Sequence, residues 1–202
     1  MKKYISYIVI FLLIIILGYY SSLHYKEKNT LTKERIWSII NNVDGTLLGS
    51  MTKNGEKELS NESKVDYIIK YIIENESKYI DIIEDSNTTL EKYNTTYYNF
   101  GKVKEKSFYK LVCDIFYSFD YNLEYSHFYN NRYIELFFEP IEYISCDSKQ
   151  ISSYYIYKGK IYMYIKYTRF MGDISNEFIV KYVFDKNTYK ICNVVILNSN
   201  LN

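Results

Sequence analysis

The sequence predicts an α+β fold: an N-terminal transmembrane helix, then about three helices packed on a mainly antiparallel sheet. Three observations support this prediction. An uncharged apolar stretch fills residues 4–23, apolar residues then recur at helical spacing to about residue 118, and short runs rich in β-branched and aromatic residues follow. Helices that precede strands, without βαβ alternation, favour α+β over α/β.

The apolar stretch is long enough to cross a membrane. A helix rises about 1.5 Å per residue, so about 20 residues span the roughly 30 Å hydrocarbon core of a bilayer. Tyrosines lie near both ends of the stretch, where aromatic rings favour the headgroup layer. The predicted organisation is an anchor over residues 1–23, a polar tether over 24–30 and one domain over 31–202.

The anchor is predicted to stay attached, with the following domain outside. Cleavage of a leader requires small residues at its end, whereas Tyr19 and Tyr20 are bulky. Lys2 and Lys3 precede the stretch in the form of an export signal, although more basic residues follow it than precede it. Long domains are translocated largely regardless of charge, so we expect a cytoplasmic N-terminus and an extracytoplasmic domain.

Three helices are expected after the anchor. The first begins near Thr32 and ends at Gly45, since glycine commonly terminates helices. The second follows a capping Ser60, and its regular apolar spacing predicts that Ile69 and Ile72 belong to the core. The third covers the segment KEKSFYKLVCDIFYSF, where the same spacing recurs.

The runs after about residue 118 predict strands, and two of the breaks between them predict hairpin turns. These turns are expected at 158–160 and 185–188, and they make the last four runs an antiparallel meander. A curved antiparallel sheet wrapped against helices is similar to the nuclear-transport-factor-2-like (NTF2-like) and cystatin-like folds. That resemblance concerns architecture and implies no activity.

Composition bears on function through charge and tyrosine content. The formal net charge is +1 over 202 residues, which argues against a nucleic-acid-binding domain, because such a domain needs a clustered basic face. Tyrosine is abundant, at 26 residues. This abundance indicates either an aromatic surface that holds sugars or bases, or the codon usage of a low-G+C genome. The tyrosines are spread along the whole chain, which favours the second interpretation.

Few residues offer catalytic chemistry, and no catalytic, cofactor-binding or metal-binding site is predicted. His127 is the only histidine within the domain and the one candidate general base of that type. The cysteines, Cys113, Cys146 and Cys192, are too widely spaced for a C-x-x-C motif. Cys113 lies beside the apolar stripe of the third helix and is expected to be a packing residue, and whether Cys146 and Cys192 pair stays open.

Two groups of carboxylates are weaker candidates. Asp81, Glu84 and Asp85 are interpreted as a solvated face rather than a metal site. Glycosidases use a pair of carboxylates, and candidates for such a pair here are Glu135, Glu139 and Glu142.

The order of elements also resembles that of sortases, transpeptidases of about this size with an N-terminal anchor, an outward β-rich domain and a His/Cys/Arg site. This resemblance would give His127, Cys146 and Arg169 the catalytic roles. The cysteine here ends the segment EYISC, where sortases have a TLxTC-type strand. As a whole, the layout resembles the small membrane-anchored exported proteins of unknown function from low-G+C Gram-positive bacteria.

The expected function is that of a single-pass membrane-anchored, non-catalytic binding or accessory module of the cell envelope. We expect residues 4–23 to lie in the membrane and the domain to bind a protein partner in the envelope. No cofactor and no nucleic acid are expected. Tethering would raise the effective concentration of the domain toward its neighbours. Two alternatives stay open: an envelope enzyme acting on wall peptide or glycan, and an accessory subunit of a larger membrane machine.

Overall fold

The structure is a computed structural model that describes residues 2–74, 79–90, 95–126, 128–137, 146–171 and 174–197. Within these ranges, the backbone alone is described at residues 2–12, 24, 27, 83–90, 95–98, 125, 169–171 and 174–176. The chain forms two compact units, Met1–Asn42 and Val43–Asn202. Its elements are helices and antiparallel sheets, which confirms the predicted α+β class.

The first unit is helical throughout its described residues and belongs to helix α1 (Lys2–Lys53). Residues 24–30, expected to form a polar tether, are part of this helix. Their composition contains no glycine or proline that would interrupt a helix. The hydroxyl of Thr30 donates to the carbonyl of Lys26 at 3.0 Å, which adds a side-chain bond to the helix in this region.

Gly45 lies inside α1, so the prediction that it ends a helix is wrong. A glycine in a helix interior costs about 1 kcal/mol relative to alanine. Residues 43–51 are all buried, and burial of their apolar side chains outweighs that cost. The helix ends at Lys53 instead, where Gly55 follows with a φ of 69°, a conformation that glycine adopts without strain.

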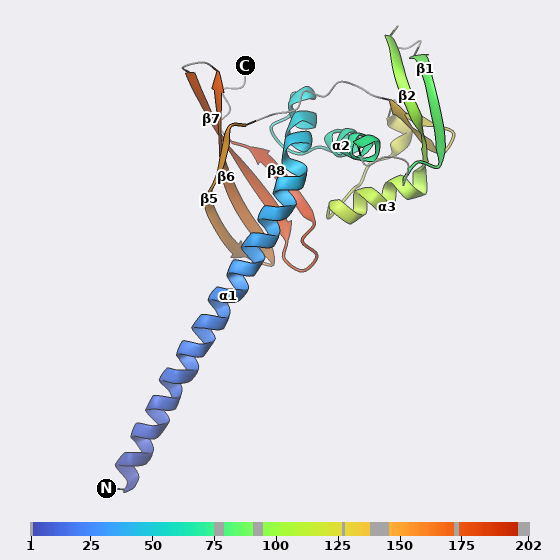
Figure 1. Cartoon of the computed structure of the whole chain (residues 1–202). Helices are drawn as coiled ribbons and strands as arrows, with labels where there is room; N and C mark the ends of the chain where they lie inside the picture. Colours follow the sequence, from blue (N-terminus) through green and yellow to red (C-terminus); the bar gives the residue numbers. More distant parts are fainter. Residues whose placement is uncertain are drawn as a thin grey trace. The chain divides into compact units, whose positions relative to one another are not determined.

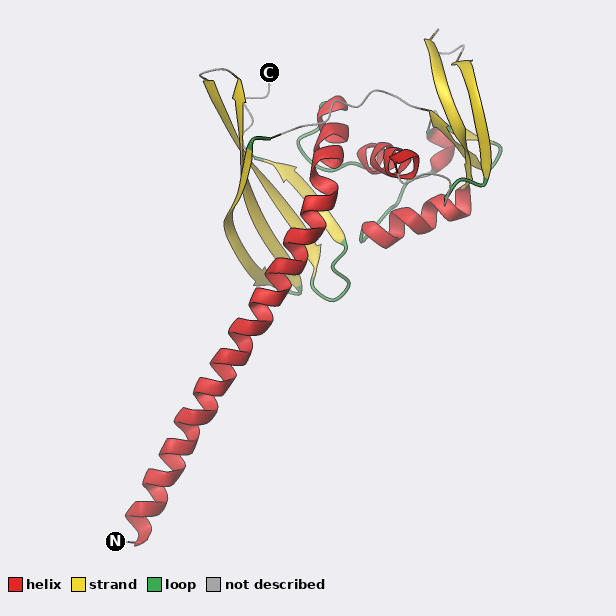
Figure 2. Cartoon of the chain, in the orientation of Figure 1, coloured by secondary structure: helices red, strands yellow, loops and turns green. Residues whose placement is uncertain are grey.

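Two further helices match the predicted ones: α2 (Asn61–Glu74) and α3 (Glu105–Ile115). Ser60 caps α2 as expected, since its hydroxyl oxygen accepts a hydrogen bond from the backbone N–H of Ser63 at 3.0 Å. Ile69 and Ile72 are buried, which confirms that they are core residues. Figure 2 shows both helices (red) beside the first of two sheets, and each of them contacts strands of that sheet.

This first sheet has the strand order β1-β2-β4-β3 and is antiparallel. Its strands are β1 (Ile82–Leu90), β2 (Thr95–Lys104), β3 (Tyr129–Asn130) and β4 (Tyr133–Phe137), with a short 3-10 helix η2 (Leu123–Tyr125) before β3. The β1–β2 hairpin precedes α3, so the prediction that strands begin only after residue 118 is wrong. The hairpin is rich in threonine and tyrosine, which favour strands, but it lacks the apolar alternation that reveals a half-buried strand.

The second sheet is the predicted antiparallel meander, in the order β5-β6-β7-β8 (Figure 1). Its strands are β5 (Ser148–Tyr157), β6 (Lys160–Met171), β7 (Ile174–Asp185) and β8 (Ile191–Ile196). The β5–β6 turn is the expected tight one, since Lys158 and Gly159 both have positive φ, at 47° and 74°, as a type I′ turn requires. Two sheets therefore take the place of the single curved sheet expected.

The outer edge of β8 is covered by two segments that come much earlier in the chain. The N–H of Leu59 donates to the carbonyl of Val194 at 2.9 Å, and the N–H of Ile196 donates to the carbonyl of Lys57 at 2.7 Å. On the same strand, the carbonyl of Ile191 accepts from Tyr117 N–H at 2.8 Å. These bonds satisfy backbone groups that an edge strand otherwise leaves open to pairing with other chains.

Candidate functional site

The second sheet exposes a cluster of tyrosines on one face. In the stretch 161–165 of β6, the odd-numbered residues are buried, whereas Tyr162 and Tyr164 are partly exposed. Because side chains alternate between the two faces of a sheet, the odd-numbered residues line the core and the two tyrosines point outward. Tyr155 and Tyr157 of β5 are exposed and extend this outward group. We call these four residues the tyrosine face.

Three rings of the tyrosine face stack on one another. Tyr155 pairs with Tyr162 in the β5–β6 register, and their ring centroids are 4.9 Å apart with planes inclined by 13°. Tyr155 also stacks on Tyr164 at 6.2 Å, and the two hydroxyl oxygens are 3.5 Å apart. This stacking occupies part of the ring faces, so the cluster offers mainly ring edges and hydroxyl groups to solvent. The hydrogen bond with Tyr164, and then burial, raise the pKa of Tyr155, so its hydroxyl keeps its proton at neutral pH.

Lysines surround the tyrosine face. Lys181 of β7 lies opposite Tyr164 in the sheet, and no carboxylate of the described residues forms an ion pair with it. Lys160, at the start of β6, pairs with Tyr157 in the register. Lys158, in the turn between these strands, places its Nζ 5.2 Å from the ring centroid of Tyr157.

Within the described part of the chain, two carboxylates lie among these lysines, and both have bonding partners. Glu177 forms an ion pair with Lys166, with 2.7 Å between Oε1 and Nζ. Oδ1 of Asp185 accepts hydrogen bonds from the N–H groups of Thr188 and Asn187, at 2.8 and 3.1 Å, and these bonds lower the pKa of Asp185 while holding the β7–β8 turn. Among the described residues, four lysines and two carboxylates thus lie around the tyrosine face, so positive charge is in excess there.

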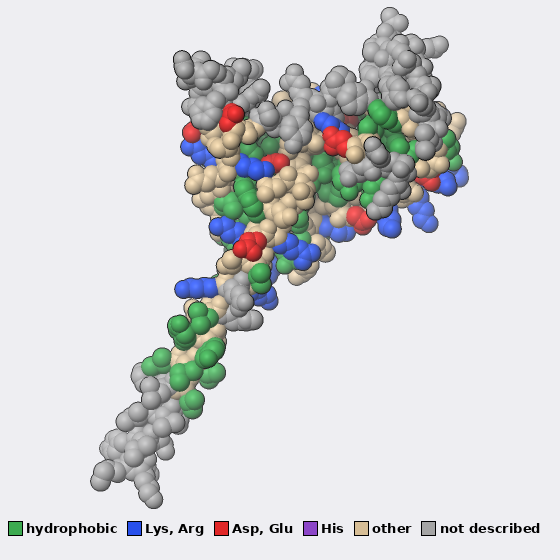
Figure 3. All heavy atoms as spheres, in the orientation of Figure 1, with side chains coloured by type: hydrophobic (Ala, Val, Ile, Leu, Met, Phe, Trp, Pro, Cys, Tyr) green, Lys and Arg blue, Asp and Glu red, His purple; other side chains and the backbone are tan. Residues whose placement is uncertain are grey.

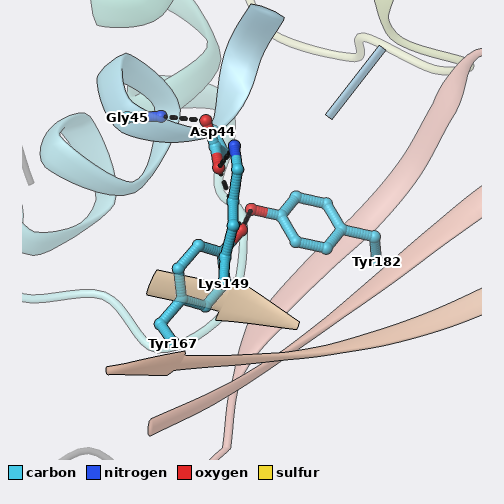
Figure 4. Close-up of polar contacts among 5 residues, drawn as sticks. All are labelled: Asp44, Gly45, Lys149, Tyr167 and Tyr182. Carbon is cyan, nitrogen blue, oxygen red and sulfur yellow. Dashed lines mark hydrogen bonds and ion pairs between the residues drawn. The ribbon is translucent and has the colours of Figure 1, made fainter. Parts of the chain in front are cut away.

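A second polar cluster lies inside the domain, around Asp44 of α1 (Figure 4). One carboxylate oxygen of Asp44, Oδ2, accepts from Lys149 Nζ at 3.0 Å and from the Tyr167 hydroxyl at 3.1 Å. The other, Oδ1, accepts from Gly45 N–H at 2.8 Å. The hydroxyl proton of Tyr167 is used in its hydrogen bond to Asp44. The hydroxyl of Tyr182, 3.0 Å from that of Tyr167, is therefore the donor in the hydrogen bond between the two tyrosines.

The Asp44 cluster joins the end of α1 to the inner face of the second sheet. Tyr182 and Tyr167 are 0% and 2% exposed and Asp44 is 7% exposed, so no substrate reaches their polar atoms. A buried carboxylate is tolerated only when it is paired and hydrogen-bonded, and here three donors satisfy it. We therefore assign this cluster a structural role and exclude it as a catalytic site.

At alkaline pH the domain is expected to lose stability as soon as free tyrosine begins to ionise. Burial raises the pKa of Tyr67, Tyr167 and Tyr182 above the value of about 10 that tyrosine has in an unfolded chain. A raised pKa in the folded state gives stability that is complete below about pH 10 and is lost above it, because unfolding lets the phenols ionise. Urea unfolding between about pH 8 and 11, followed by near-ultraviolet circular dichroism, measures this loss.

Tyr182→Phe should weaken this pH dependence, whereas Tyr157→Phe, at an exposed position, should leave it unchanged. Tyrosinate absorbance provides the second measurement. Ionisation of every tyrosine in the folded protein, before the unfolding transition, would contradict the assigned burial.

A cleft of about 450 Å³ is found in the part of the domain that holds the first sheet. It is lined by Tyr79, Ile80, Asp81, Ser107, Lys110, Leu111 and Asp114. Its Asp81 was a member of the predicted acidic cluster. The carboxylate of Asp81 accepts from the N–H of Lys104 at 2.7 Å and lies 3.5 Å from its Nζ, so it holds the junction of β2 and α3. Across the described residues no three metal-binding side chains come together.

The structure does not show the catalytic residues implied by the sortase resemblance together in one site. His127 lies outside the described residues, and for Arg169 only the backbone is described. Cys146 precedes β5 and is partly buried. Glu135, from the other carboxylate group, lies 3.5 Å from Lys102 Nζ in an ion pair. Glu139 and Glu142 lie outside the described residues.

All three cysteines are thiols. Cys146 adjoins β5 and Cys192 lies on β8, and these strands form opposite edges of the second sheet, which accounts for the lack of a disulfide between them. Cys113 of α3 is exposed, so the prediction that it packs next to the apolar stripe of this helix is wrong. The buried residues of α3 are Phe108 and Val112, and position 113 follows by 100° around the helix, outside that stripe.

No known protein family, curated protein or solved structure matches the chain. The NTF2-like or cystatin-like fold therefore stays a prediction. The tyrosine face was not predicted, although the sequence contains a signal for it. In KIYMYIK, tyrosines alternate with buried apolar residues, and a tight turn joins this run to another, YYIY, with the same residue type. Alternation on both sides of a two-residue turn places such tyrosines on one face.

Proposed function

We propose that this protein is a non-catalytic binding module of the cell envelope, held at a membrane by its N-terminal helix and binding its ligand through the tyrosine face. The observation that carries this proposal is the exposed cluster of stacked tyrosines with lysines around it. Tyrosine supplies a large contact area together with a hydroxyl group that forms hydrogen bonds, which is why it is enriched in binding interfaces.

Binding is favoured over catalysis by the chemistry of this face. A general base must release and accept protons near the working pH. The pKa of the Tyr155 hydroxyl is raised, and the lysines beside it supply positive charge. These groups supply hydrogen-bond donors and positive charge, which hold a ligand but do not activate a nucleophile.

Membrane attachment is proposed for residues 4–23. The side chains described in this stretch are exposed and mostly apolar, as Figure 3 shows along the helix; Leu17 and Tyr20 are 65% and 67% exposed. Over the residues that the structure describes, no helix has the apolar length needed to cross a membrane. The proposal draws on the sequence, in which residues 4–23 carry no charge. We place the domain on the extracytoplasmic side, following the export-signal form of the first residues.

Site-specific crosslinking in cells that make the full chain tests the binding role. A photo-reactive amino acid is introduced at Tyr157, on the tyrosine face, or at Tyr117, which is distant in sequence; both tyrosines are 56% exposed. Equal exposure makes the second position a matched control for chance collisions. We expect adducts from position 157 at several times the yield from position 117, recovered in membranes washed at alkaline pH.

Equal yields at the two positions would remove the support for a binding role of the tyrosine face. Release of the full chain into the alkaline wash would contradict the anchor alone. The two parts of the proposal are thus tested separately by one preparation.

A further inference from the structure

The outward side chains of β6 form a row of alternating chemistry. They are Lys160, Tyr162, Tyr164 and Lys166, in that order along the strand. Outward residues of a strand are about 7 Å apart, so the row extends over about 20 Å. Lys181 adds a positive charge beside Tyr164 from the neighbouring strand. A ligand that lies along β6 therefore meets the positive charges of Lys160 and Lys181 and the phenol hydroxyl groups beside them. Lys166, at the far end of the row, is already ion-paired with Glu177.

We infer that the ligand of the tyrosine face is an anionic glycan, a polymer of sugar units that carry phosphate or carboxylate groups. This inference rests on the proposed binding function of the same face. The lysines complement the anionic groups of such a polymer. The phenol hydroxyl groups both donate and accept hydrogen bonds, as do the hydroxyl groups of sugars. The length of the row suits a polymer better than a single small anion.

The ring geometry favours a glycan over single-stranded nucleic acid. Proteins that bind single strands stack bases on open aromatic ring faces. Here the ring of Tyr155 stacks on Tyr162 and Tyr164, so these faces are partly occupied by one another. Ring edges carry the positive end of the aromatic quadrupole, and they attract anionic groups as the neighbouring lysines do.

The composition of the face also disfavours a lipid surface. A protein that lies on a membrane buries exposed leucine, phenylalanine or tryptophan side chains among the acyl chains. Among the described residues of β5–β8, the large apolar side chains that are highly exposed are Tyr155 and Tyr157. Their hydroxyl groups suit a hydrated polymer, and the sheet offers no apolar wedge.

Binding of the purified full chain, held in nanodiscs of neutral lipid, tests the inference. The probes are phosphorylated dextran and polygalacturonate, with unmodified dextran as the uncharged match. Single-stranded poly(U) and phosphatidylglycerol vesicles represent the competing ligand classes. We expect both anionic glycans to bind at least about tenfold more tightly than dextran, and added salt to weaken them, because opposite charges attract less when screened.

Matched variants connect this binding to the face. Lys160→Gln with Lys181→Gln should lower the affinity for both anionic glycans about tenfold, since charge-assisted bonds are lost. Tyr155→Phe with Tyr164→Phe removes two hydroxyl groups and should lower it about fivefold. Lys106→Gln and Tyr117→Phe change exposed residues elsewhere in the domain and should have no effect. Near-ultraviolet circular dichroism confirms that each variant is folded.

The outcomes separate the inference from the proposed function. Three results would overturn the inference that the ligand is an anionic glycan. They are equal affinity for dextran and the anionic glycans, tighter binding of poly(U) or vesicles than of those glycans, and unchanged glycan affinity in the double lysine variant. The absence of glycan binding together with crosslinking of a protein from position 157 would also overturn it, and would leave the binding role standing with a protein as ligand. Failure of crosslinking at position 157 would instead overturn the proposed function.

Discussion

Replacing Asp44 by alanine is expected to lower the free energy of unfolding by about 3 kcal/mol, because a buried cluster loses its central acceptor. The change removes the acceptor of Lys149 and Tyr167 and the side-chain bond to the N–H of Gly45. Lys149 is partly exposed and regains some hydration, which limits the loss. Urea unfolding of the full chain, monitored by tyrosine circular dichroism, measures the change.

Asp114→Ala is the matched control, since Asp114 is an exposed aspartate on a helix, and its effect should stay within about 0.5 kcal/mol. A double-mutant cycle with Tyr167→Phe should show a coupling of at least about 0.5 kcal/mol, because the two side chains share a hydrogen bond. A loss below about 1 kcal/mol for Asp44→Ala would mean that the carboxylate is hydrated rather than buried.

Ile72→Ala should lower the free energy of unfolding by about 2–5 kcal/mol, the usual range for truncating a fully buried isoleucine. Ile72 is 0% exposed on α2, a helix of 14 residues. The lost contacts leave a cavity that the surrounding helices and sheet fill only in part. The same unfolding measurement on the full chain determines the loss.

Ile73 provides a control of identical chemistry, because it follows Ile72 on α2 but is only partly buried. Ile73→Ala should therefore cost less than half as much as Ile72→Ala. Equal costs at both positions would show that α2 does not present one face to the core.

The sequence predicted the regular parts of the fold well. The apolar spacing of α2 identified Ile69 and Ile72, and the turn residues identified the meander, because both signals are local. Gly45 was misinterpreted because its effect depends on burial of the residues around it. The β1–β2 hairpin was missed because its pattern shows neither helical nor strand periodicity clearly.

The candidate site was harder to predict because it depends on pairing between strands. Tyr155 and Tyr162 meet only through the β5–β6 register, and Lys181 joins them from β7. A count of tyrosines along the chain does not show which of them share a face. Asp44 was likewise missed, since its partners Lys149 and Tyr167 are more than 100 residues away.

The covered edge of β8 has a consequence for the order of events during synthesis. Residues 57–59 and 117 leave the ribosome long before residues 191–196, with which they pair. Contacts between such distant parts of a chain form slowly, so the domain completes its fold only after β8 has emerged. A premature stop before residue 191 would leave residues 57–59, Tyr117 and the free edge of β7 without their pairing strand, and such edges promote aggregation.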